Sequence, residues 1–242
     1  MEKTKKSLVE ARLPTNYGTF RIIAFPGDSK EKENLALVMG EVEGRMLVRV
    51  HSECFTGDVL HSMRCDCGEQ LDLAMKRIAE EGKGIIVYLR QEGRGIGLVN
   101  KLKAYNLQDE GMDTVEANIA LGFNAELRGY QGAVDILRNL GVEKVKLMTN
   151  NPSKVEDLEN AGFDVEELRH SSEPNEENKD YLKTKASKMN HNLEKHLQNH
   201  LCGMPGTTFW CHGGQANLQL YVLTIFVQIG GAIGEPFGTT FS

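Results

Sequence analysis

Three of the five cysteines in this sequence stand close together. One residue separates Cys65 from Cys67, and Cys54 lies a short loop upstream of both, within the run RVHSECFTGDVLHSMRCDC. Thiolates at this spacing can converge on a single borderline or soft cation, and Zn²⁺ is the metal that fits them best. The sequence therefore predicts a zinc site formed by Cys54, Cys65 and Cys67.

The number of protein ligands at this site decides what the metal does. A structural zinc normally has four protein ligands, whereas a catalytic zinc leaves one position open for a water molecule that it activates. His51, His61 and Asp66 all stand near enough in the sequence to be a fourth ligand. The alternative is that the three thiols are buried structural cysteines. Because the residues around them are mostly polar, we interpret the stretch as an active site.

Two further stretches have the chemistry of phosphate binding. Residues 90–97, RQEGRGIG, follow the apolar run IIVYL and combine three glycines with two arginines. Glycines let the backbone approach a phosphate closely, although a tight turn with exposed arginines gives the same pattern. Further on, Pro152 begins a helix soon after the strand KVKLMT. A helix N-terminus at the end of a strand binds anions, and Thr149 and Lys154 stand beside it.

Composition limits the classes of function. The 242 residues carry a formal net charge of −6, whereas proteins that bind nucleic-acid polymers are usually basic. A local basic cavity for one small anion is compatible with that charge. The N-terminal residues lack the apolar core of a signal peptide, and clustered cysteines beside His and Asp fit a reducing compartment. We expect a cytoplasmic protein that binds neither a nucleic-acid polymer nor a membrane.

The elements that position these residues alternate between strands and helices from residue 46 onward. Hydrophobic periodicity predicts strands at 18–25, 35–39, 46–51, 85–89, 144–149 and 163–168. It predicts helices at 70–81, 98–109, 114–121, 132–140, 153–160 and 181–195. We expect residues 1–13 to be an exposed lead-in and strand 85–89 to be central and buried on both faces. This order predicts an α/β (α+β) fold, a mixed sheet with flanking helices and a β-rich N-terminal portion.

The end of the chain differs in composition from the rest. From residue 201 onward there is no Lys or Arg and one acid, Glu235, among many glycines. The apolar run 218–233 is interrupted by glutamines and glycines, and it falls short of the roughly 20 apolar residues that span a bilayer. We therefore predict a catalytic domain over residues 1–195 and a separate Gly-rich apolar tail over residues 196–242.

Several stretches of the chain resemble the GTP cyclohydrolase II family, in that family's order, over residues 46–190. They are RVHSECFTGDVLHSMRCDCG, YLRQEGRGIGLVNKLKAYNLQDEGMDTVEAN, LRGY, LMTNNPSK and YLKTKASKM. The resemblance implies a homodimeric zinc enzyme that performs the first step of riboflavin biosynthesis. Such an enzyme hydrolyses GTP to 2,5-diamino-6-ribosylamino-4(3H)-pyrimidinone 5′-phosphate, formate and pyrophosphate, with Mg²⁺ accompanying the triphosphate.

The resemblance also assigns roles to individual positions. It implies that Cys54, Cys65 and Cys67 hold the zinc. It implies that Tyr105 supplies a proton or orients water, that Arg128 attacks the α-phosphate and that Glu126 accepts a proton. The residues implied to contact GTP are Arg49, Val50, His51, Ser52, Glu53, Gln70, Glu92, Gly93, Arg94, Thr114, Thr149 and Lys154.

Two alternatives to this function follow from departures within the family. A relative can stop at the formamidopyrimidine or act on another purine nucleotide, but Tyr105 favours the complete reaction. An inactive GTP-binding homologue is the second alternative, because Glu126 stands where the family pattern has Asp and has a longer reach. Product analysis with GTP separates the three possibilities.

Overall fold

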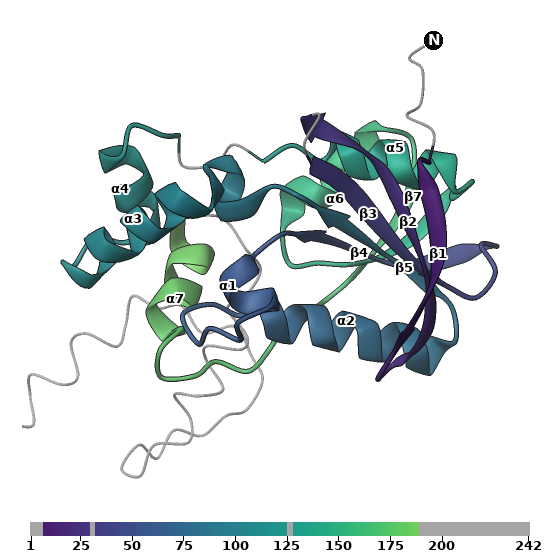
Figure 1. Ribbon diagram of the computed structural model, residues 1–242, viewed down its shortest axis with the longest axis horizontal. Coiled ribbons are helices and arrows are strands. Elements are labelled where there is room, and N and C mark those ends of the chain that lie inside the picture. The colour runs from purple at the N-terminus through teal and green to yellow at the C-terminus, as the bar shows by residue number, and fades with distance from the viewer. Residues whose placement is uncertain (1–6, 30–31, 125–127, 189–242) are drawn as a thin grey trace, which may run out of the picture. The chain divides into compact units, whose positions relative to one another are not determined.

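The described strands form one seven-stranded sheet in the order β1-β2-β3-β5-β4-β6-β7 (Figure 1). The computed structural model describes residues 7–29, 32–124 and 128–188. The strands are β1 (Val9–Thr15), β2 (Gly18–Ser29), β3 (Lys32–Met39), β4 (Arg45–Ser52), β5 (Gly84–Leu89), β6 (Lys144–Met148) and β7 (Asp164–Leu168). The described helices are α1 (Phe55–Asp58), α2 (Cys67–Glu81), the 3-10 turn η1 (Glu92–Gly95), α3 (Gly97–Asp109), α4 (Thr114–Ala120), α5 (Gln131–Asn139), α6 (Pro152–Asn160) and α7 (Lys179–Lys188).

The sheet is mixed, with an antiparallel N-terminal part and a parallel part. β1, β2, β3 and β5 pair antiparallel in that order, whereas β5, β4, β6 and β7 pair in parallel. β5 is the fourth of the seven strands, and its Ile85, Ile86 and Val87 are fully buried. A parallel strand covered on both faces has this continuous apolar sequence. The predicted α/β fold with a β-rich N-terminal portion is confirmed.

Helices cover both faces of the sheet with separate apolar cores. Ile136 of α5 and Leu158 of α6 belong to the larger core on one face. Ala74 and Ile78 of α2 pack with Phe20 on the other face. Each large apolar side chain buried in this way contributes about 1.5–3 kcal/mol to folding. The two layers of helices therefore hold the parallel strands rigidly in place.

The four parallel strands end at the same edge of the sheet. β4 leads to Cys54, β5 to residues 90–97, β6 to Thr149 and β7 to His170. In Figure 1, α3, α4 and α7 lie beyond the sheet, and α1 lies between α7 and the strands. Open α/β sheets bind ligands outside the carboxyl ends of their strands. The fold therefore brings all the predicted chemical stretches to one place.

Several predicted boundaries were wrong. The lead-in expected over residues 1–13 is a strand from Val9 onward, because β1 pairs with β2 along its whole length. Its charged residues and Pro14 hid it, although both are usual on an edge strand. The short helix α1 was not predicted, and α2 begins at Cys67, three residues before the predicted start.

The C-terminal predictions lie partly outside the described residues. α7 begins at Lys179, two residues before its predicted start, and residues 189–195 of the predicted helix are not described. The tail predicted over residues 196–242 also lies outside the described part. Within the described part, no helix has the length and apolar character that crossing a bilayer requires.

Candidate active site

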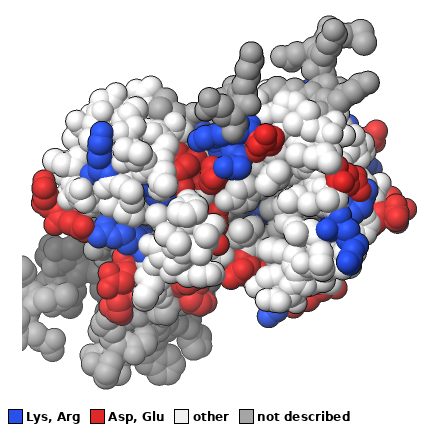
Figure 2. Space-filling model, viewed as in Figure 1, with Lys and Arg blue, Asp and Glu red and all other residues white. Residues whose placement is uncertain are grey.

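A cavity lies at the carboxyl ends of the parallel strands, and its lining is strongly basic. Two carboxylates, Glu53 and Asp66, line it. On the face shown in Figure 2, positive and negative side chains are interspersed and form no broad basic surface. Positive charge concentrated in a cavity of an acidic protein suits a small polyanion. The seven Lys and Arg residues that line the cavity are Arg49, Arg64, Arg94, Lys101, Arg128, Lys154 and Lys185.

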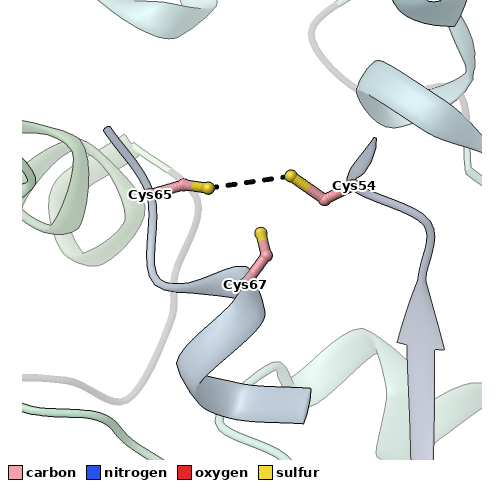
Figure 3. Close-up of side chains that lie close together, drawn as sticks. All are labelled: Cys54, Cys65 and Cys67. Atoms are coloured by element: carbon pink, nitrogen blue, oxygen red, sulfur yellow. Dashed lines mark hydrogen bonds between the residues drawn. The ribbon is translucent and has the colours of Figure 1, made fainter. Parts of the chain in front are cut away.

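The three predicted metal ligands converge on one point (Figure 3). The sulfur atoms of Cys54, Cys65 and Cys67 all lie within 4.8 Å of one another, and the Sγ atoms of Cys54 and Cys65 are 3.6 Å apart. Tetrahedral zinc with Zn–S bonds of about 2.3 Å sets sulfur atoms about 3.8 Å apart. The three thiols therefore fit zinc.

Gly57 makes room for this cluster. A Cβ atom at this position would lie 2.9 Å from Sγ of Cys65, 3.1 Å from Sγ of Cys54 and 3.1 Å from Cβ of Cys67. Contacts this short do not occur without displacing an atom. Helix α1, which carries Gly57, thus fixes the space in which the sulfur atoms meet.

None of the three candidate fourth ligands joins the cysteine cluster. Among the described His, Cys, Asp and Glu residues, the group that can hold a metal consists of the three cysteines. His61 is exposed, His51 Nε2 bonds Asp58, and Asp66 bonds Lys185. Three protein ligands leave a coordination position open, which is the pattern of a catalytic zinc site.

Charged and polar groups around Cys54 favour its thiolate. Hydrogen bonds from Cys65 and Cys67 lower the pKa of Cys54 below its usual range, and the nearby charge of Lys101 adds to this effect. The hydrogen bond with Cys54, together with burial, raises the pKa of Cys65 to about 11. Although burial opposes its charge, Cys54 and Glu92 raise the pKa of Lys101 above its usual value. The cluster thus concentrates negative charge on Cys54 and positive charge beside it.

Tyr105 lies next to the cysteine cluster. Its hydroxyl group is 3.2 Å from Oγ1 of Thr56, which is itself 3.7 Å from Sγ of Cys54. The guanidinium carbon of Arg64 lies 4.9 Å from the centroid of the Tyr105 ring. Burial raises the pKa of Tyr105, so the phenol keeps its proton at neutral pH. Tyr105 is therefore a proton donor within reach of a molecule in the cavity.

A chain of buried hydrogen bonds connects β4, α2 and α7. Arg49 donates to the carbonyl oxygen of Met148 at 2.8 Å and to Gln70 at 2.5 Å. Gln70 donates to Asp66 at 2.5 Å, and Lys185 donates to the other oxygen of Asp66 at 2.6 Å. Burial lowers the pKa of Arg49 to about 10, which still leaves it charged at neutral pH. The chain fixes Asp66, which stands between two of the cysteines.

His51 is held by a second buried group. Its Nε2 atom lies 3.0 Å from Oδ1 of Asp58, whose other oxygen accepts bonds from Tyr88 and from the backbone N–H of Cys54. Burial lowers the pKa of His51, so its ring is neutral. The proton of the neutral ring is then on Nε2, which donates a hydrogen bond to Asp58. Nδ1 is buried without a partner among the described residues and can accept a hydrogen bond.

The glycine–arginine loop places Arg94 at the cavity. Arg94 has φ 63°, a strained value for a residue other than glycine. Both terminal nitrogens of Arg94 are buried and have no hydrogen-bond partner among the described residues. Buried polar groups are rarely left unpaired, and the exceptions need an explanation. Because Arg94 lines the cavity, a bound anion would satisfy these donors.

The predicted anion site after β6 has the expected helix start. Asn151 caps α6 by accepting from the backbone N–H of Ser153, and Pro152 is the first helical residue. Thr149 accepts from the backbone N–H of Asn151 at 3.0 Å. The ammonium group of Lys154 donates to the carbonyl oxygen of Val50 at 2.8 Å, which holds it at the cavity wall.

Most of the predicted site residues lie at this cavity. Val50 and Glu92 are exceptions, because they do not line it. Glu126 lies outside the described residues, whereas Arg128 lines the cavity. The remaining predicted residues that line it are Arg49, His51, Ser52, Glu53, Cys54, Cys65, Cys67, Gln70, Gly93, Arg94, Tyr105, Thr114, Thr149 and Lys154.

Sequence reasoning missed several residues of the cavity. Lys101 and Lys185 stand within the stretches NKLKAY and YLKTKASKM, which resemble the family but carry no chemistry when read alone. His170 was not predicted as a site residue, yet it is fully buried and its Nε2 lies 2.7 Å from the carbonyl oxygen of Gln70. No local pattern indicates that these residues meet.

A family model and the curated relatives of this chain both name one family. The model of the family described as GTP cyclohydrolase II matches residues 5–170. A GTP cyclohydrolase-2 from Haemophilus influenzae (strain Rd) is 51% identical over 199 residues, covering 78% of this chain and 92% of that protein. One from Actinobacillus succinogenes is 50% identical over 201 residues, covering 82% and 93%. A crystal structure of RibBX, a two-domain 3,4-dihydroxy-2-butanone 4-phosphate synthase from A. baumannii, is 26% identical with a TM-score of 0.34, covering 61% of this chain and 35% of that one. That structural likeness is too low to bear on the fold.

Proposed function

Because this chain belongs to the GTP cyclohydrolase II family, we propose that it is a zinc enzyme that converts GTP to 2,5-diamino-6-ribosylamino-4(3H)-pyrimidinone 5′-phosphate, formate and pyrophosphate. Its relatives are enzymes by name, and hydrolysis of GTP for riboflavin biosynthesis follows from the family. The finer proposal concerns the metal, the products and the residues that act.

The observation that carries the proposal is that Arg94 and the three cysteines line one cavity. The two terminal nitrogens of Arg94 are buried and have no hydrogen-bond partner among the described residues. A guanidinium binds phosphate oxygens with two parallel hydrogen bonds, and partnerless donors gain most from such a ligand. A phosphorylated substrate held there presents its other end to the metal site. This arrangement supports a nucleoside triphosphate as substrate.

At the base end of the substrate, this chain contributes ligands and a proton donor. Cys54, Cys65 and Cys67 would hold zinc, which when bound acts as a Lewis acid that activates water for attack on C8 of guanine. Tyr105 keeps its proton and lies beside the cluster, which supports a role in protonating or orienting the opened ring. His51 has a neutral ring, and its Nδ1 atom, which has no partner within the described part of the chain, offers a hydrogen-bond acceptor in the same cavity.

At the phosphate end, the chain contributes positive charge and a helix N-terminus. Arg94, Lys154 and the start of α6 would bind the triphosphate, with Mg²⁺ accompanying it. The proposal keeps Arg128 as the group that attacks the α-phosphate, with Glu126 as proton acceptor. We also propose a homodimer, because Val59, Leu60 and other apolar side chains lie exposed on the surface. A cytoplasmic location is proposed because the free cysteines fit a reducing compartment.

The variant Cys65→Ser tests whether ring opening depends on the zinc site while pyrophosphate release depends on the phosphate contacts. It should lose zinc and stop releasing formate, because water is no longer activated at C8. Pyrophosphate release should persist, because the phosphate contacts do not involve Cys65. Zinc content, formate and pyrophosphate are measured on the same preparation, with Cys202→Ser as the control because Cys202 is not a predicted ligand. Full formate production by Cys65→Ser would exclude the zinc assignment.

A further inference from the structure

Lys101 reaches the metal-ligand cluster from α3. Its ammonium nitrogen lies 3.1 Å from Sγ of Cys54 and 2.8 Å from Oε1 of Glu92. The Lys101 side chain is 12% exposed and that of Glu92 is 4% exposed. Lys101 therefore points inward and divides its donors between a predicted zinc ligand and a buried carboxylate.

Glu92 is fixed independently of Lys101. Its Oε2 atom accepts from the backbone N–H of Phe55 at 2.6 Å, and its Oε1 atom accepts from the backbone N–H of Gly93 at 2.7 Å. Phe55 directly follows Cys54, so Glu92 ties the glycine–arginine loop to the metal-ligand loop. A carboxylate held in this way sets the position of the ammonium group, and the ammonium group is thereby held against Cys54.

A positively charged donor beside Cys54 offsets part of the negative charge of three thiolates. Three thiolates carry one negative charge more than the two positive charges of zinc, and thiolates are strong electron donors. Both effects make zinc a weaker Lewis acid toward a fourth ligand. A hydrogen bond to a coordinating sulfur withdraws electron density from it, and groups that bond the ligands tune a metal site in this way.

We propose that Lys101 is a positioning residue that donates a charged hydrogen bond to the Cys54 thiolate and so keeps the metal site electrophilic enough to open the guanine ring. This inference rests on the proposed function, and it deepens it by assigning a role outside the ligands and the substrate contacts. Lys101 acts through Cys54, so its removal affects ring opening more than the release of pyrophosphate.

The variant Lys101→Met tests the inference, because methionine has a similar length and no charge. We expect formate release to fall by about 10- to 100-fold, the range measured for partners of metal ligands, while pyrophosphate release changes less. The second readout is the thiolate-to-metal charge-transfer band of the Co²⁺-loaded protein. Without its hydrogen bond, Cys54 donates electrons more readily, so the band moves to longer wavelength. Lys101→Arg, which keeps the charge, should restore the band in part.

Lys103→Met is the matched control, since Lys103 is exposed on the same helix. If Lys101→Met does not fold, Lys101→Gln replaces it and the same band is measured. A folded neutral variant whose band coincides with that of the unmodified protein would overturn the inference. A failure of the proposed function looks different, because the unmodified protein would then bind no Co²⁺ or release no formate from GTP.

Discussion

At the scale of single residues, the metal site depends on Gly57, which is not a metal ligand. Gly57 lies against the sulfur atoms of Cys54 and Cys65, where a Cβ atom would approach them to 3.1 Å and 2.9 Å. The sulfurs belong to the residue before α1, a loop residue before α2 and the first residue of α2, and the backbone of α1 at Gly57 lies against all three cysteines. The size of residue 57 therefore bears directly on metal affinity.

We expect Gly57→Ala to weaken zinc binding by at least about tenfold, since the added methyl group pushes the sulfur atoms off the geometry that zinc requires. Chelator competition measures the affinity. Gly141→Ala is the control: its φ of 75° disfavours alanine, but nothing lies within 4 Å of the added atom. It should cost stability and leave zinc affinity unchanged. Equal zinc affinities in the two variants would contradict the account of Gly57.

Residue-level chemistry was only partly readable in the sequence. The spacing of the cysteines predicted the cluster, because residues so close in sequence have few ways to be far apart. The same spacing could not decide whether His51 or Asp66 is a fourth ligand. That depends on the hydrogen bonds of His51 to Asp58 and of Lys185 to Asp66, which only the structure shows. Lys101 escaped notice because a lysine on a helix is usually solvated.

At the scale of elements, α7 is joined to the metal-ligand loop by one buried ion pair. Lys185 donates to Asp66 at 2.6 Å, and their side chains are 11% and 2% exposed. Asp66 also accepts a hydrogen bond from Gln70, which in turn accepts one from Arg49. The last described helix thus helps to fix the wall of the cavity rather than lying free on the surface.

Replacing Lys185 by Met should destabilise the protein by about 3 kcal/mol, because it leaves a buried carboxylate without its charged partner. The KM for GTP should also rise, since the cavity wall loses a positive charge. Urea unfolding measures the first effect. Lys179→Met is the control, because Lys179 on the same helix pairs with the exposed Glu176. A loss no larger than that of the control would show that α7 is not anchored through Lys185.

Elements with a clear pattern of apolar or capping residues could be predicted from the sequence, whereas short or charged elements could not. The central strand β5 and the Asn151–Pro152 helix start have unambiguous residues. β1 alternates apolar residues with Glu10 and Arg12, but these charges and Pro14 are also typical of an exposed segment outside the sheet. Helix α1 is four residues long, which is too short for any period to show.

At the scale of the whole molecule, the site exists because the sheet order gathers distant segments. β4 lies between β5 and β6, so residues 49–54, 90–97 and 149–154 meet at one edge. The sequence predicted six of the seven described strands but not their order, which depends on pairings between segments far apart in the chain. The whole cavity therefore had to be seen in the structure.

The burial of His170 in the folded protein makes the folded state sensitive to acid. Burial, together with the charge of Arg49, lowers the pKa of His170 to about 2, against about 6.5 in an unfolded chain. Below about pH 6.5 the unfolded chain therefore binds a proton that the folded chain does not, and stability falls as pH falls.

His170→Gln should lose about 1.4 kcal/mol less stability than the unmodified protein when the pH drops from about 7.5 to about 5.5, as one histidine of this kind requires. Urea unfolding at the two pH values gives the difference. His61→Gln, at an exposed position, controls for the loss of a histidine as such. Identical pH dependence in His170→Gln and the unmodified protein would mean that His170 takes up its proton without unfolding.

The central claim is that one cavity both activates water at zinc and holds a triphosphate. The most direct measurement incubates the zinc-loaded protein with GTP and Mg²⁺ and follows formate and pyrophosphate in the same sample. The account predicts that both are released in equal amounts. Pyrophosphate without formate would contradict the role of the cysteine site and favour a product that keeps the formamide. Tight binding of GTP with neither product would contradict the enzyme assignment of this cavity.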